Sequence, residues 1–174
     1  IPNNNAVDAA FSAANYLLKS GIKASGCGLS EEAREKGMTQ YKRARLVYDA
    51  VAKAGWYANS EPASMKAALC LVYMGKADDA REILEGVREP MHWDAAYGLY
   101  WLTLAHLEFV DNEYNTALEH AVQSLAFETK DMDVFPNALA LTARCYEETL
   151  DWHRARDVYY EVARLFEGTE WHRF

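Results

Sequence analysis

The chain of 174 residues has little cysteine, proline and glycine, and it contains no long hydrophobic run. Its three cysteines form an odd and sparse set without metal-ligand spacing, which argues against a disulfide framework or a zinc site. Four prolines and nine glycines leave most of the chain free to form regular elements. No apolar stretch approaches the roughly 18 residues of a membrane-spanning helix. We therefore expect a globular domain without a membrane span.

Basic residues are also fewer than acidic ones: the chain has 18 basic and 26 acidic residues, which gives a net charge of −8. Nucleic-acid binding needs a basic stripe that displaces counterions from phosphates. The chain offers only short basic stretches such as Lys42 to Arg45, which lies on a predicted helix diluted by acids. This composition disfavours a nucleic-acid partner. An acidic surface can attract a basic partner, or it can simply keep a protein soluble.

Catalytic and cofactor-binding motifs are missing as well. The sequence has no HExxH, GxSxG, phosphate loop or GxGxxG. Glu147 and Glu148 are adjacent, so on a helix they point in different directions and make a poor acid–base pair. The five histidines are scattered over different predicted helices: His92, His106, His120, His153 and His172. We expect no enzyme, no cofactor and no metal site.

Helical periodicity is what the sequence does contain. From Val7 to Leu18 apolar side chains recur at three-to-four-residue spacing and predict an amphipathic helix that ends at Gly21. Residues 21–29 are rich in glycine and serine and predict a loop, in which Cys27 is the candidate for a reactive thiol. A second helix follows from Ser30, with Gly37 as a weak point. The later predicted helices cover 60–74, 77–87, 92–110, 113–127, 134–150 and 152–166.

These segments repeat. The second helix of each pair carries an alanine in a similar setting, at Ala44, Ala80, Ala117 and Ala155, with intervals of 36, 37 and 38 residues. Two helices that cross closely need a small residue at the contact. Short connections make neighbouring helices antiparallel. The sequence therefore predicts an all-α fold of stacked helix pairs.

The pattern resembles the tetratricopeptide repeat (TPR) family, whose first helix carries Trp, Leu-Gly and Tyr and whose second helix carries Ala. In the third pair, Trp101, Leu104 and Ala105 occupy the Trp and Leu-Gly places, and Ala117 occupies the second-helix place. The repeats are longer than the family's usual length. The resemblance implies a right-handed α–α superhelix (solenoid) of about four helix pairs over residues 30–166. Residues 1–29 would then form a degenerate cap and residues 167–174 an aromatic tail.

In this family the first helices line a concave groove that binds peptides, so the resemblance implies a non-catalytic scaffold for a protein or peptide segment. The groove candidates are Met65, Leu69, Val72, Tyr73, Leu102, His106, Phe109, Asn137, Ala140, Arg144 and Glu147. Of these, only Asn137 and Arg144 are even remotely suited to the family's clamp for a peptide C-terminus, so a receptor of that kind is not expected. An amphipathic helix or an extended segment is the expected ligand. Leu69 and Leu102 are equally expected as packing residues between helices.

Exposed aromatic residues suggest a different role for the same stack. Trp93, Tyr97 and Trp101 are predicted to form a ridge on one helix, either as core between repeats or as an interface with a partner. Trp171 and Phe174 near the end of the chain are expected to dock, because a free tail rarely keeps large aromatic residues. Docking into another copy would create a head-to-tail contact that propagates. The alternative function is therefore a self-assembling structural protein that forms a homo-oligomer or filament.

The sequence leaves the cellular compartment open. It begins Ile1-Pro2 without a methionine, which is compatible with a cropped chain or with a removed signal segment. A cytoplasmic location fits the first case, and a periplasmic or extracellular location fits the second.

Overall fold

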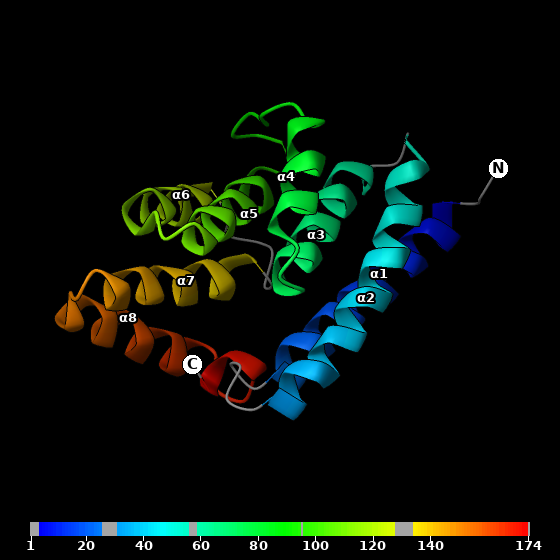
Figure 1. Cartoon of the computed structure of the whole chain (residues 1–174). Coiled ribbons are helices and arrows are strands. Elements are labelled where there is room, and N and C mark those ends of the chain that lie inside the picture. Colours follow the sequence, from blue (N-terminus) through cyan, green and yellow to red (C-terminus); the bar gives the residue numbers. More distant parts are fainter. Residues whose placement is uncertain (1–3, 26–30, 56–58, 95, 128–133, 174) are drawn as a thin grey trace. The chain divides into compact units, whose positions relative to one another are not determined.

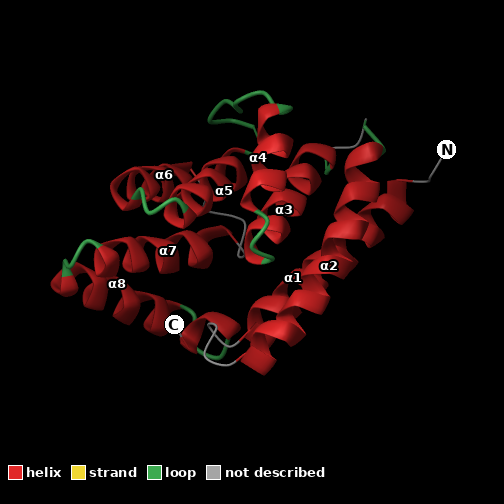
Figure 2. Cartoon of the chain, viewed as in Figure 1, coloured by secondary structure: helices red, strands yellow, loops and turns green. Residues whose placement is uncertain are grey.

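The structure is a computed structural model that describes residues 4–25, 31–55, 59–94, 96–127 and 134–173. Every regular element in these ranges is helical, with eight α-helices and a short 3-10 helix joined by turns and loops (Figure 2). The predicted all-α class is confirmed. Cys27 and Ser30, where a reactive thiol and the start of the second helix are predicted, lie outside the described residues.

The chain divides into two compact units, Ile1–Arg88 and Glu89–Phe174. The N-terminal unit contains α1 (Asn4–Ser25), α2 (Glu31–Lys53), α3 (Ser60–Tyr73) and α4 (Ala77–Glu85). Each of these helices packs against the next one along the chain. The long α1 and α2 lie side by side as an antiparallel hairpin (Figure 1).

The C-terminal unit repeats this plan with four α-helices of 14 or 15 residues each. Its elements are α5 (Tyr97–Val110), α6 (Tyr114–Phe127), α7 (Val134–Glu148), α8 (Trp152–Leu165) and the 3-10 helix η2 (Glu170–Arg173). Consecutive α-helices pack together, and α5 also contacts α7. The first helices of the two hairpins therefore touch directly.

Three hairpins close with the same turn. Gly75, Asn112 and Leu150 each follow a first helix with φ of 73°, 66° and 63°. At each turn the next residue donates its N–H to a carbonyl five residues back, as Lys76 does to Leu71 at 2.9 Å. The equivalent bonds are Glu113 N to Glu108 O at 2.9 Å and Asp151 N to Tyr146 O at 2.8 Å. This is the Schellman motif, which satisfies carbonyls that a helix end leaves free.

The repeat alanines follow these turns in constant register. Ala80, Ala117 and Ala155 each lie five residues after the left-handed residue of their turn. They and Ala44 are between 0 and 3% exposed. Local backbone geometry and burial therefore repeat with the sequence period.

The prediction that the first helix ends at Gly21 is wrong, because α1 continues to Ser25. Gly21 lies against α2, where a Cβ atom would come within 2.5 Å of the Tyr41 ring. Gly37 is not a weak point either, since α2 is continuous there and a Cβ would lie 3.0 Å from the Gly21 carbonyl oxygen. Both glycines permit a close approach of two helices instead of ending one.

The later helices match their predicted ranges except at the start of α5. The predicted helix begins at residue 92, but the structure begins it at Tyr97. Before it, Met91 N donates to the Asp94 carboxylate at 2.7 Å, and Tyr97 N donates to Asp94 O at 3.1 Å. The Asp94 side chain and backbone thus stabilise a turn, and Trp93 belongs to that turn.

A buried polar cluster joins the first three helices. Lys66 on α3 is 2% exposed, and its ammonium donates to Asn15 Oδ1 on α1 at 3.0 Å. The Tyr48 hydroxyl on α2 donates to the same oxygen at 2.7 Å. Lys66 also lies 5.4 Å from the centre of the Phe11 ring. A buried polar group costs little when it is hydrogen-bonded, so this cluster determines which faces of the three helices meet.

Candidate interaction surface

The groove residues predicted on α3 lie mostly inside the N-terminal unit. Met65 and Leu69 are 0% and 2% exposed, and Val72 is also buried. Tyr73 is half-buried, and its ring centre lies 5.2 Å from that of Tyr41. These side chains are therefore packing residues, as the alternative for Leu69 anticipated.

On α5 and α7 the predicted groove residues separate into a buried layer and a surface layer. Leu102 and Ala140 are buried. His106 is also buried, and its Nε2–H donates to Asn137 Oδ1 at 3.0 Å. Burial lowers the pKa of His106 to about 4, so the imidazole is neutral at physiological pH. Because the Asn137 side chain is buried, it is not placed to hold a peptide carboxylate.

The surface layer is formed by Phe109 and Arg144, which we call the Phe109–Arg144 edge. The guanidinium carbon of Arg144 lies 4.3 Å from the centre of the Phe109 ring, a cation–π contact between α5 and α7. Phe109 is half-buried and Arg144 is exposed. Among the described residues, no carboxylate forms an ion pair with Arg144. An oriented guanidinium of this kind can bind a carboxylate through two N–H groups.

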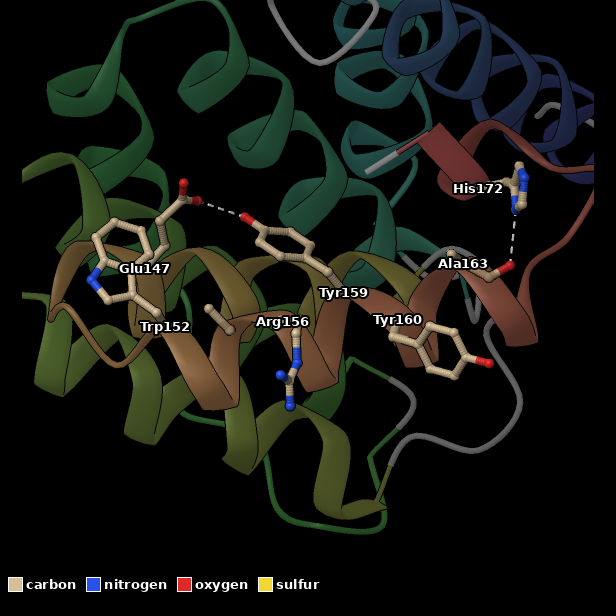
Figure 3. Close-up of a pocket in the computed structure, with 8 residues that line it drawn as sticks. Glu147, Trp152, Arg156, Tyr159, Tyr160, Ala163 and His172 are labelled. Atoms are coloured by element: carbon tan, nitrogen blue, oxygen red, sulfur yellow. Dashed lines mark hydrogen bonds between the residues drawn. The ribbon is translucent and has the colours of Figure 1, made fainter.

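Glu147, the remaining groove candidate, faces α8. Its Oε2 accepts a hydrogen bond of 2.9 Å from the Tyr159 hydroxyl (Figure 3). This bond belongs to a shallow depression along α8 with a volume of about 570 Å³, which we call the α8 pocket. The pocket is lined by Glu147, Trp152, Ala155, Arg156, Tyr159, Tyr160, Ala163 and His172.

The walls of the α8 pocket are largely aromatic. Trp152 and Tyr160 are 58% and 72% exposed. Arg156 donates to the Asp157 carboxylate at 2.7 Å, so its charge is paired with that of an adjacent acid. Trp, Tyr and Arg are the residue types that contribute most to binding at protein interfaces. Trp152, Arg156 and Tyr160 are not among the site residues predicted from the sequence, although their four-residue spacing on one predicted helix is a visible signal.

The predicted aromatic ridge does not form a single surface. Trp93 lies in the turn before α5 and is 70% exposed, whereas Tyr97 on α5 is 7% exposed and hydrogen-bonded to Gln123. Trp101 is half-buried, and its ring centre lies 4.9 Å from that of His120. Placing Trp93 on the helix was wrong because the Asp94 turn delays the start of α5.

A histidine–carboxylate pair lies next to Trp101. His120 Nδ1 on α6 is 2.7 Å from Glu108 Oε2 on α5, and both side chains are about one-quarter exposed. Desolvation by burial raises the pKa of Glu108, and the neighbouring His120 opposes this effect. The pair holds α5 against α6.

The aromatic tail docks in part. Trp171 is 4% exposed, and η2 packs on α7 and α8. His172 Nδ1 donates to the Ala163 carbonyl at 2.9 Å, which brings the His172 ring to one end of the α8 pocket (Figure 3). Phe174 lies outside the described residues.

Neither a metal-ligand group nor a membrane-spanning helix occurs in the described part of the chain. The described residues include no group of three or more His, Cys, Asp or Glu side chains able to hold a metal ion. Over the same residues, none of the helices combines the length and apolarity needed to cross a membrane. Comparison of the sequence and structure with family models, curated proteins and solved structures finds no match.

Proposed function

We propose that the chain is a non-catalytic protein–protein interaction module, built as a right-handed superhelix of four tetratricopeptide-like helix pairs. The constant register between the left-handed turn residue and the repeat alanine supports this architecture in three of the four pairs. The contact between α5 and α7 adds support, because stacked repeats bring their first helices together.

The observation that carries the binding role is the Phe109–Arg144 edge. Stacking on the ring holds the guanidinium in one orientation, so less side-chain entropy is lost when a ligand binds. The ring offers apolar contact beside the charge. The chemistry suits a peptide segment that places an apolar side chain next to an aspartate, a glutamate or a terminal carboxylate.

Selection from a random peptide library displayed on phage tests this proposal. Enriched peptides should contain an acidic residue close to an aromatic or aliphatic one. By calorimetry, Arg144→Ala should weaken their binding about tenfold or more, because a charged hydrogen bond contributes about 1.5–3 kcal/mol. Phe109→Ala should also weaken it.

Arg164→Ala is the matched control, because it removes another exposed arginine of the C-terminal unit away from the edge. It should leave peptide affinity unchanged. If no peptides are enriched, or if Arg144→Ala and Arg164→Ala bind them equally well, the proposed role of the edge is wrong.

A further inference from the structure

The two units carry opposite net charges. Residues 1–88 contain 12 lysines and arginines against 10 acidic residues, a net charge of +2. Residues 89–174 contain 6 against 16, a net charge of −10. Opposite charges on two parts of one chain favour association of the basic part of one copy with the acidic part of another.

The basic charge of the N-terminal unit includes an exposed face of α2. Lys42, Arg43, Leu46, Ala50 and Lys53 are all exposed on this helix, and Leu46 is 69% exposed. Arg43, Leu46, Ala50 and Lys53 recur at three-to-four-residue spacing and therefore share one side of the helix. We call these five residues the basic face of α2. It presents cations around a central leucine, the composition expected of a surface that binds aromatic and acidic groups.

Three residues of the α8 pocket correspond, through the repeat, to residues of helix α6. Residues 38 apart correspond, so Leu118, Ala121 and Leu125 of α6 match Arg156, Tyr159 and Ala163 of α8. On α6, His120 and Ser124 bond to α5, and α7 is a second helix that packs against α6. Leu118 and Leu125 are half-buried and Ala121 is buried, whereas Arg156 on α8 is exposed and Tyr159 and Ala163 are half-buried.

On α8 the matching stripe has changed its chemistry. Leucine is replaced by arginine at one position and alanine by tyrosine at another, and Trp152 and Tyr160 extend the surface as exposed rings (Figure 3). The Glu147 carboxylate lies at the pocket with its charge unpaired by a cation among the described residues. Exposed Trp and Tyr rings beside a carboxylate attract lysine and arginine through cation–π and ionic contacts.

We infer that the α8 pocket binds the basic face of α2 of a second copy of this chain. Leu46 packs into the α8 pocket between its two ends, and the flanking Lys42 and Arg43 lie near the Trp152 ring and Glu147, which share one end of the pocket (Figure 3). The two surfaces are different, so the contact is heterologous, and a pair of copies keeps one free pocket on one copy and one free basic face on the other. Copies therefore add head to tail. This goes beyond the proposed peptide-binding function, because it uses a surface other than the Phe109–Arg144 edge.

Sedimentation velocity of the 174-residue chain over a roughly hundredfold range of concentration is the first measurement. The weight-average mass should rise with concentration, and added salt should reduce it, since charge pairs at the rim are screened. Two double variants then test the two sides of the contact separately. Trp152→Ala with Tyr160→Ala removes the pocket walls, and Lys42→Glu with Arg43→Glu reverses the basic face. Each should weaken self-association at least tenfold.

Mixing the two double variants distinguishes this contact from any other. The pocket variant retains the basic face and the charge-reversal variant retains the pocket, so the mixture should form a 1:1 dimer that cannot grow. Lys23→Glu with Lys76→Glu is the matched control, because it changes the net charge equally at exposed sites off the basic face. That variant should assemble like the wild type.

Three outcomes overturn the inference: a monomer at every concentration, assembly that persists in both double variants, or a mixture that stays monomeric while both variants keep their helical circular dichroism. The peptide experiment at the Phe109–Arg144 edge does not depend on this result, so the failure of one proposal is distinguishable from the failure of the other.

Discussion

The two units use the same hairpin plan with different chemistry at the points where helices meet. In the N-terminal unit a buried lysine, Lys66, donates to Asn15 Oδ1 at 3.0 Å. In the C-terminal unit a buried histidine, His106, donates to Asn137 Oδ1 at 3.0 Å. Each pair joins the first helices of two successive hairpins, α1 with α3 and α5 with α7. An asparagine oxygen can thus serve the same packing role for a lysine donor and for a histidine donor.

The units also differ in how closely their helices approach. Gly21 and Gly37 bring α1 and α2 together, whereas α5 and α6 are held by larger groups such as the His120–Glu108 pair. Every histidine of the chain lies in the C-terminal unit. The units should therefore respond differently to acid and to changes in packing.

The largest expected effect is on cysteine labelling, which reports each unit separately. Cys70 is buried in the N-terminal unit and Cys145 in the C-terminal unit, and desolvation raises the pKa of each thiol to about 12. At about pH 8 their thiolate fractions should be roughly a thousandfold lower than that of an ordinary cysteine. We expect Cys27 to react first, and mass spectrometry of digested protein measures the three rates. Equal rates would contradict the buried positions of Cys70 and Cys145.

The next largest expected effect is that of acid on the stability of the C-terminal unit. The pKa of His106 is lowered to about 4 from an ordinary value of 6.5, so between these values the unfolded chain binds more protons than the folded one. The free energy of unfolding of the C-terminal unit should then fall as pH drops from about 6.5 to about 4, by on the order of 2–3 kcal/mol. His106→Gln removes the titrating group but keeps a donor for Asn137. Denaturant unfolding at several pH values measures the slope, and an unchanged slope in this variant would contradict the assignment.

Overpacking at the repeat alanines tests whether the units unfold independently. Ala80→Leu places a large side chain at a buried crossing in the N-terminal unit, and Ala117→Leu does so in the C-terminal unit. Each should lower the free energy of unfolding by about 1–3 kcal/mol. Labelling of Cys70 and Cys145 during denaturation shows which unit opens first. If a variant leaves the unfolding transitions of both units unchanged, its alanine does not lie at a tight contact.

The smallest expected effect concerns the equivalent turns. Leu150 has a left-handed backbone at φ 63°, a conformation that costs a residue with a side chain about 1–2 kcal/mol. Leu150→Gly should stabilise the C-terminal unit by about 0.5–1 kcal/mol, since glycine recovers part of that cost and loses some to chain entropy. Gly75→Ala should destabilise the N-terminal unit by about 1 kcal/mol, although nothing lies within 4 Å of the added Cβ. Thermal unfolding measures both, and equal signs would contradict the shared turn geometry.

The C-terminal tail illustrates how far sequence reasoning reaches. The expectation that Trp171 docks follows from the cost of leaving an indole in water. Its burial beside α7 and α8 is local, since η2 follows α8 directly. The ridge of Trp93, Tyr97 and Trp101 shows the opposite case. A single side chain, Asp94, stabilises a turn that competes with helix formation, and spacing alone does not reveal which structure prevails.

The sequence by itself determined the all-α class, most helix limits and the register of the repeat alanines. These features follow from local periodicity and from backbone preferences, which act between residues a few positions apart. Tertiary structure decided which predicted groove residues are core and which are surface, because the burial of a helical face depends on which distant helix packs against it. It also decided the roles of Gly21 and Gly37, where a missing side chain meets a ring or a backbone carbonyl from the neighbouring helix. The α8 pocket was also decided by the tertiary structure, since its walls come from α7, α8 and η2 together.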